Sequence, residues 1–199
     1  KLMKKLFGLG KGLGSLIPSN VESANPNKKD NVFYVETAGN LKEMWATRAY
    51  MAKEFPKAKF VITLDHSLLS KRLNEKDDNE LLANLSKVFN EWKKYFGDLI
   101  VVIGQLNGDI EQPIRKENPL FHYPKKTDIH GSNQMFWACD TVIIFHRPEI
   151  LYIEKYGREK RDTKQLIHIA FIKTRHGKLG HVWLKNELHK GLITDWTTQ

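Results

Sequence analysis

The chain has 199 residues, of which 41% are hydrophobic and 28% charged, the composition of an ordinary soluble globular protein able to build a packed core. No apolar run approaches the ~20 residues that span a bilayer, no signal-peptide core is present, and the single Cys139 excludes an internal disulfide framework. We therefore expect a cytoplasmic protein with no membrane partner. The formal net charge of +9 favours polyanionic partners, of which nucleic acid is the commonest.

Residues 1–31 have the composition of a flexible tail. Glycines at positions 8, 10, 12 and 14 are followed by Pro18, Pro26 and many Asn, Ser and Lys residues. Such a segment buries too little apolar surface to order itself. We expect a basic tail over 1–31 and one folded domain over 32–199.

Strand and helix patterns alternate through the first part of this domain. Short β-branched or wholly apolar runs indicate strands, and apolar residues at helical spacing indicate helices. The expected elements are a strand at 32–35, a helix at 41–55, a strand at 60–64, a helix at 78–96 and a strand at 99–103. The alternation is typical of an α/β fold with a mainly parallel sheet and flanking helices.

The second part of the domain is organised differently. A long polar loop is expected from Asn107 to Gly131, followed by a short helix at 133–138 and a fourth strand at 141–145. Three later apolar runs are separated by glycine-containing turns, and they lie at 166–172, 181–184 and 192–193. This pattern predicts antiparallel strands that finish the sheet.

The positive charge is concentrated toward the C-terminus. Eight Lys or Arg residues and two acidic residues lie between Lys155 and His181. Such a stretch is either a solvated surface loop or a surface that faces DNA, and composition leaves both interpretations open.

Two polar residues follow apolar strands at the edge where parallel sheets bind ligands. Asp65 follows the strand at 60–64, where a carboxylate can hold Mg²⁺ or its water shell beside nucleotide phosphates. Asp is also a common turn former at strand ends. Gln105 follows the strand at 99–103, where its amide either hydrogen-bonds a γ-phosphate or caps the strand.

Five ordered segments of the chain resemble the DnaB-type replicative helicases of superfamily four. Gly104–Asn107 is similar to the family's Ser-Gln-Leu-Asn motif, and Val61–Asp65 is similar to its Walker B strand. The other matching segments are Asp128–Asp140, Phe145–Glu149 and Ile172–Val182. The resemblance implies a RecA-like motor domain of an ATP-dependent 5'–3' DNA helicase that acts in DNA replication. It also implies ATP and Mg²⁺ as cofactors, single-stranded DNA as a partner, and a homo-oligomeric, hexameric ring.

The same resemblance implies roles for residues that meet the nucleotide. Asp65 would serve the Mg²⁺ site through water, and Gln105 would sense the γ-phosphate. Lys173 and Arg175 would be finger residues that reach the ATP of the neighbouring subunit, where cations stabilise the charge that develops during phosphoryl transfer. A simple basic β-turn is the alternative for these two residues.

The family's DNA-gripping loop falls on His130, Gly131 and Asn133. In that loop, backbone amides and a cation meet DNA phosphates. The family has Arg where this chain has His130, which implies a weaker or partly pH-dependent grip. Lys125 and Lys126 either supply the missing charge or are simply solvated.

The chain also departs from the family. It contains no GxxxxGK[ST] phosphate loop, and the family's catalytic Glu has no counterpart, so the N-terminal half of the RecA-like fold is incomplete. We expect a fragment or a degenerate copy of the motor that is inactive as an ATPase alone. The alternative is a non-enzymatic module that binds DNA or a partner ATPase.

The tail has a resemblance of its own. Phe7–Pro18, rich in Gly, Leu and Lys, is similar to the N-terminal box of ParB-type chromosome-partitioning proteins, in which a basic tail engages a partner ATPase. A disordered linker is the alternative interpretation of this segment.

Overall fold

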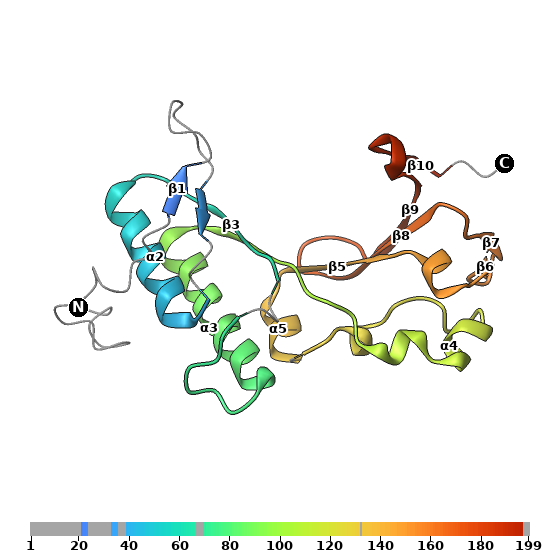
Figure 1. The fold of residues 1–199 in the computed structure, drawn as a ribbon, viewed down its shortest axis with the longest axis horizontal. Helices are drawn as coiled ribbons and strands as arrows, with labels where there is room; N and C mark the ends of the chain where they lie inside the picture. Colours follow the sequence, from blue (N-terminus) through green and yellow to red (C-terminus); the bar gives the residue numbers. More distant parts are fainter. Residues whose placement is uncertain (1–20, 24–32, 36–38, 67–69, 132, 197–199) are drawn as a thin grey trace. The chain divides into compact units, whose positions relative to one another are not determined.

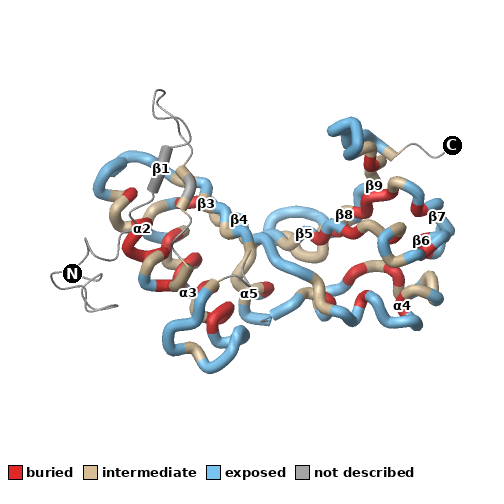
Figure 2. Tube along the Cα trace, in the orientation of Figure 1, coloured by how far each residue is buried: buried red, intermediate tan, exposed pale blue. Residues whose placement is uncertain are grey.

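The computed structural model describes residues 21–23, 33–35, 39–66, 70–131 and 133–196. The chain divides into two compact units, one ending at Gly104 and the other beginning at Gln105. Each unit has its own secondary structure and its own buried residues (Figures 1 and 2). In the described part of the chain, no helix combines the length and the hydrophobicity needed to cross a membrane.

The first unit alternates strands and helices as the sequence predicts. Its elements are β1 (Val21–Ser23), β2 (Phe33–Val35), α2 (Leu41–Glu54), β3 (Val61–Leu64), α3 (Asp78–Phe96) and β4 (Leu99–Val102). β1 pairs antiparallel with β2, and β3 pairs in parallel with β4. β1 falls within the range expected to be tail; the remainder of that range, including the glycine-rich segment, lies outside the described residues.

Local capping explains where the two helices begin and end. The Asn40 side chain accepts the backbone amide of Glu43, and the Glu43 carboxylate accepts the amide of Asn40, so a capping box begins α2. Asp77 caps α3 by accepting the amide of Glu80 at 2.8 Å. Gly97, at φ 70°, ends α3 in the left-handed conformation that glycine adopts without strain.

The core of the first unit combines aromatic packing with one buried ion pair. Trp45 of α2 and Trp92 of α3 meet edge to face, with ring centroids 5.8 Å apart. Arg48 donates from Nε to the Asp98 carboxylate at 2.6 Å, and both side chains are almost fully buried. The same carboxylate accepts the amide of Phe60 at 3.0 Å. Asp98 therefore links α2 to the segments that lead into β3 and β4.

The second unit contains more structure than the sequence predicts. Its elements are η3 (Gly108–Glu111), α4 (Pro113–Glu117), η4 (Lys126–Asp128), α5 (Asn133–Ala138), β5 (Thr141–His146), η5 (Pro148–Leu151), β6 (Lys155–Tyr156), β7 (Arg161–Asp162), β8 (Leu166–Thr174), β9 (Gly180–Glu187), η6 (Leu188–Lys190) and β10 (Leu192–Asp195). The segment expected to be one polar loop holds α4 and two 3-10 helices. Pro113 at the first position of α4 and Asn107 capping η3 begin these short turns.

The sheet of the second unit is antiparallel throughout, in the order β10-β9-β8-β5. The antiparallel end expected from the sequence is therefore present, and it extends further than expected because β5 pairs with β8. Among the described strands, parallel pairing is confined to β3 and β4. The register of β5 and β8 shifts between Val142 and Ile143, where a bulge lets one strand bend.

A buried network of histidine and tyrosine side chains lies against this sheet. The Tyr156 hydroxyl is 2.8 Å from Nδ1 of His146 and 2.9 Å from Nδ1 of His168. It is also 3.2 Å from the carbonyl oxygen of His122. All three contacts are satisfied when the hydroxyl donates to the carbonyl and accepts from both Nδ1–H groups. Nε2 of His168 then accepts from Nδ1–H of His181, 2.8 Å away.

Burial holds these imidazoles in the neutral form. His146 is 5% exposed and His168 is 0% exposed. Burial lowers the pKa of His146 to about 4, and the nearby charge of Arg115 acts in the same direction. Burial likewise lowers the pKa of His168 to about 3, with a further contribution from His181. In the unfolded chain the pKa of histidine is about 6.5, so the unfolded state binds more protons than the folded state between these values.

Stability should accordingly fall as the pH falls. The depressed pKa values of the two histidines leave the free energy of unfolding at its full value above about pH 6.5. That free energy then falls progressively as the pH drops toward the folded-state pKa values. Between about pH 7 and about pH 5, we expect the free energy of unfolding to fall less in His168→Gln than in the wild-type chain, because glutamine does not titrate. Urea unfolding at each pH measures this difference. His189→Gln, at an exposed position, should keep the wild-type pH dependence; an equal loss in all three proteins would contradict the assignment.

Candidate functional site

Asp65 is the candidate residue of the first unit. It follows β3 directly and is exposed. β3 and β4 are held in register, with Val61 opposite Leu99, and the pairing continues to a hydrogen bond from the Ile103 amide to the Leu64 carbonyl at 3.0 Å. The carboxylate therefore lies at the carboxyl end of a parallel pair, as expected. The other eight candidate residues belong to the second unit.

Gln105 lies in a short antiparallel ladder with the segment that carries the expected DNA loop. The carbonyl of Gln105 accepts the amide of His130 at 2.9 Å, and the amide of Asn107 donates to the carbonyl of Asp128 at 2.7 Å. Leu106 and Ile129 form a β-bridge between these two bonds. Residues 105–107 and residues 128–130 are therefore joined directly through their backbones.

The buried ion pair of Arg115 and Asp128 anchors this ladder. The guanidinium donates to both carboxylate oxygens, at 2.7 and 2.9 Å, and also to the carbonyls of Phe121 at 2.6 Å and Tyr123 at 3.1 Å. Burial alone would raise the pKa of the Asp128 carboxyl, but the hydrogen bonds from Arg115 and the Lys125 amide lower it. Asp128 is 0% exposed, so it holds the chain in place and is not available to a ligand.

The residues expected to touch DNA project from the anchored segment. Lys125, His130, Gly131 and Asn133 are exposed. The ammonium of Lys125 lies 5.1 Å from the centre of the Phe121 ring. Gly131 has φ 98°, a conformation that residues with a Cβ rarely adopt. The exposed backbone at this turn can approach a phosphate closely.

Lys126 and Lys173 both lie against the aromatic side chains of α5. The Lys126 ammonium is 5.0 Å from the ring centre of Phe136 and 4.3 Å from that of Trp137. Lys173 donates from Nζ to the carbonyl oxygens of Phe136 and Trp137, both at 2.8 Å. Burial lowers the pKa of Lys173. Lys173 thus closes the C-terminal end of α5, where carbonyl groups lack partners within the helix.

Arg175 follows β8 and pairs with a carboxylate just beyond α5. Its Nη1 lies 2.7 Å from Oδ1 of Asp140, and its backbone amide donates to the Asp140 carbonyl at 2.9 Å. Both side chains are about half exposed, so solvent screens the pair. Lys173 and Arg175 thus contact one continuous segment, residues 136–140.

Sequence reasoning missed Arg115, Phe136 and Trp137. Arg115 carried no signal, because its partner is distant in sequence and lies in a segment expected to be a loop. Phe136 and Trp137 lie within an expected helix of six residues, which is too short for periodicity to separate a buried face from an exposed one. An exposed Trp beside several lysines is a signal that only the structure supplies.

The described residues include no group of three or more side chains suited to hold a metal ion. Mg²⁺ in nucleotide sites commonly takes one or two protein ligands, with water and phosphate oxygens as the others. Asp65, a single exposed carboxylate at a strand end, fits such a role, in which the nucleotide brings most of the ligands.

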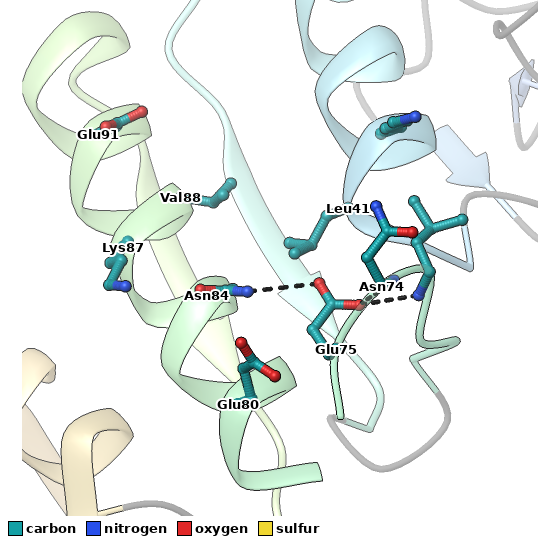
Figure 3. Close-up of a pocket in the computed structure, with 10 residues that line it drawn as sticks. Leu41, Asn74, Glu75, Glu80, Asn84, Lys87, Val88 and Glu91 are labelled. Carbon is teal, nitrogen blue, oxygen red and sulfur yellow. Dashed lines mark hydrogen bonds between the residues drawn. The ribbon is translucent and has the colours of Figure 1, made fainter. Parts of the chain in front are cut away.

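A pocket of the first unit lies elsewhere. It is formed between the start of α2, residues 73–75 and one side of α3 (Figure 3). Glu75 accepts the amide of Leu73 at 2.8 Å and the side-chain amide of Asn84 at 3.5 Å. Glu80 and Glu91 also line the pocket. Three carboxylates against two lysines, Lys42 and Lys87, give the lining a net negative charge that disfavours a phosphate ligand, and none of the candidate residues lines this pocket.

Comparison with known proteins identifies the fold. The family model described as the DnaB-like helicase C terminal domain matches residues 19–192. A solved structure of an ATPase domain aligns with a TM-score of 0.59 at 14% identity, covering 78% of this chain and 51% of that one. A solved structure described as that of a DnaB-like replicative helicase and its interactions with primase aligns with a TM-score of 0.57 at 17% identity. The alignment covers 72% of this chain and 32% of that one. The α/β, RecA-like fold expected from the sequence is thus confirmed.

The chain spans about half of the first of these structures and a third of the second. No curated protein sequence matches it.

Removing the charge of Asp128 tests the anchor. Asp128→Asn should destabilise the second unit by about 3 to 5 kcal/mol, because the Arg115 guanidinium is left buried without its countercharge. Chemical denaturation followed by circular dichroism measures the loss. Asp162→Asn is the matched control, since the Asp162 carboxylate lies on the surface, 3.7 Å from Lys155, and should leave the midpoint unchanged. Equal midpoints for the two variants would show that the pair does not anchor the segment.

Proposed function

Because the chain belongs to the DnaB-like helicase C-terminal domain family, we propose that it forms part of the motor of an ATP-dependent DNA helicase that acts in replication. The observation that carries the proposal is the ladder between residues 105–107 and 128–130. The ladder joins Gln105, whose side chain is expected to sense a γ-phosphate, to the loop expected to grip single-stranded DNA. A motor requires such a connection, because nucleotide state must change the hold on DNA.

Each candidate residue has a role in this proposal. Asp65 holds the water shell of Mg²⁺, and Gln105 contacts the γ-phosphate. Arg175 and Lys173 reach the nucleotide of a neighbouring subunit in a ring, which requires Arg175 to exchange Asp140 for phosphate oxygens. The exchange is feasible because the ion pair is half exposed and such pairs contribute only about 0 to 1 kcal/mol.

The loop residues form the proposed DNA contact. Lys125 and Lys126 supply positive charge, and the exposed turn at His130, Gly131 and Asn133 supplies backbone and side-chain donors. These groups suit phosphate oxygens, which carry most of the affinity for nucleic acid without regard to sequence.

Hydrolysis would need a phosphate loop from outside these 199 residues, since the sequence has no GxxxxGK[ST]. One face of the parallel pair supports this part of the proposal. Val61 and Leu99 lie opposite each other and are 68% and 60% exposed, and Val101 on the same face is 40% exposed. Parallel strands in α/β proteins are normally covered on both faces, so this face suits a further element of the RecA-like fold.

Binding to single-stranded DNA is the first test. Fluorescence anisotropy with labelled oligo(dT) should give an affinity that falls linearly with salt on a logarithmic plot, because bound phosphates release their counterions. Lys125→Ala combined with Lys126→Ala should reduce the slope by about 1.4, at about 0.7 for each single-strand phosphate that is no longer neutralised.

Lys87→Ala combined with Lys94→Ala is the matched control for that test. Both residues are exposed on α3, and their substitution removes the same charge as the first double variant does. Because α3 lies outside the proposed DNA contact, the salt slope should stay at the wild-type value. A slope that changes equally in both double variants would indicate net charge alone, and no binding at any salt concentration would remove the DNA-binding part of the proposal.

ATP hydrolysis is the second test. The 199-residue chain should show no turnover alone. In a protein in which a phosphate-loop half is joined upstream, Arg175→Ala should lower turnover about a thousandfold with little change in nucleotide affinity, since the contact forms mainly in the transition state. Mixing this variant with Asp65→Ala should restore some activity at interfaces that pair the two intact residues. Arg158→Ala, exposed within the basic stretch, serves as control.

The outcomes separate the motor from a binding module. Near-full turnover in Arg175→Ala would remove the finger assignment. DNA binding without hydrolysis, even after the upstream half is restored, would leave a non-enzymatic module that binds nucleic acid.

A further inference from the structure

An exposed tryptophan lies among lysines on α5 of the second unit. Trp137 is 63% exposed, whereas the neighbouring Phe136 is 9% exposed. Their rings meet edge to face, with centroids 5.5 Å apart. We call Trp137, Phe136, Lys126 and Lys173 the aromatic–lysine patch. The large indole ring is thus supported from one side by a buried ring and offers most of its surface to solvent.

The patch is held firmly by the chain around it. Lys173 donates two hydrogen bonds of 2.8 Å to the carbonyls of Phe136 and Trp137, which fixes the backbone that carries the indole. The Lys126 ammonium lies 4.3 Å from the centre of the indole ring, within the range of a cation–π interaction. Lys126 is part of η4, whose last residue is the buried Asp128. The indole is therefore presented on an ordered base.

The chemistry of the patch favours nucleic acid over a protein partner. Stacking of a base on an aromatic ring next to a cation that meets the adjoining phosphate is the usual way in which proteins hold single strands. The buried centres of protein–protein interfaces are depleted in lysine, whereas here two ammonium groups lie within 5.5 Å of the ring centre. The ring also follows the exposed turn at His130 and Gly131 by only a few residues.

We propose that Trp137 is a stacking platform for a base of single-stranded nucleic acid, with Lys126 placed to neutralise the adjoining phosphate. The inference rests on the proposed DNA-binding function and adds a contact to the bases, which the phosphate-binding loop does not make. Base stacking is tolerant of sequence, since every base has a π face. The platform thus adds affinity for unpaired strands, whose bases are free to stack, and not for paired ones.

The test compares two labelled oligonucleotides of equal length, oligo(dT) and an abasic strand with the same phosphates. The full chain should bind oligo(dT) more tightly than the abasic strand. Trp137→Ala should weaken oligo(dT) binding about tenfold, within the range measured for loss of one stacked base, and should leave abasic binding unchanged. Trp137→Phe, which keeps an aromatic face, should retain most of the oligo(dT) affinity. Thermal melts of each variant confirm that the fold is kept.

Tyr152 provides the control, because it is 91% exposed and lies in the same unit outside the patch. Tyr152→Asn suits its positive φ of 60° and should change neither affinity. An equal loss on both oligonucleotides in Trp137→Ala, or no loss on either, would overturn the platform while leaving the DNA-binding proposal intact. No binding of either strand by the wild-type chain would overturn both. Unchanged affinity with an altered oligomeric state in sedimentation would assign Trp137 to a contact between protein chains.

Discussion

The ion pair of Arg115 and Asp128 determines the conformation of the segment on which the proposed function depends. One guanidinium holds a carboxylate and two backbone carbonyls, so the segment from α4 to η4 closes around a single charged group. The neighbours of Asp128 on its C-terminal side are those that pair with residues 105–106. Burying two charges is costly unless every donor and acceptor is satisfied, and here the surrounding carbonyls and amides supply the partners.

Polar groups also occupy the interior of the second unit beside its sheet. Tyr156 and His168 are 0% exposed, and the His168 ring stacks on Trp183 with centroids 4.3 Å apart. A hydrogen-bonded interior of this kind restricts how its side chains can be arranged more strongly than an aliphatic core does. Each unit therefore combines ordinary apolar packing with a buried polar arrangement that specifies its geometry: Arg48 with Asp98 in the first, the histidines with Tyr156 in the second.

The sequence predicted the elements whose signals are local. The helix at 78–96 was predicted at both ends from apolar residues that repeat at helical spacing, and the structure shows Asp77 and Gly97 capping it. The short helix at 133–138 and the strand at 141–145 were also close to the observed α5 and β5. The antiparallel pairing of β5 with β8 was not predicted, since a near-continuous apolar run is typical of a parallel strand that is covered on both faces.

The candidate site was only partly accessible to sequence reasoning. The resemblance located Gln105 and the loop around His130 because their motifs are contiguous in the chain. The hydrogen bond between the backbones of Gln105 and His130 could not be predicted. It depends on the fold of the intervening segment, which Arg115 stabilises, and Arg115 belongs to no recognisable motif. The exposure of Trp137 likewise depends on tertiary packing, and the roles of the nine candidate residues remain predictions.

The contacts of Lys173 and Arg175 with residues 136–140 have a thermodynamic consequence. Lys173 binds the end of the short helix that bears Trp137, and Arg175 binds the carboxylate just beyond that helix. An anion that binds Lys173 or Arg175 in place of these contacts must therefore weaken the stabilisation of residues 136–140. If the nucleotide of an adjacent subunit binds these cations, it changes the affinity of the surface of α5 for nucleic acid. Thermodynamic linkage then requires nucleic acid to change the affinity for the nucleotide by the same factor. Lys173 and Arg175 would thus couple ligand binding on one chain to nucleotide binding on the next, with the same effect in both directions.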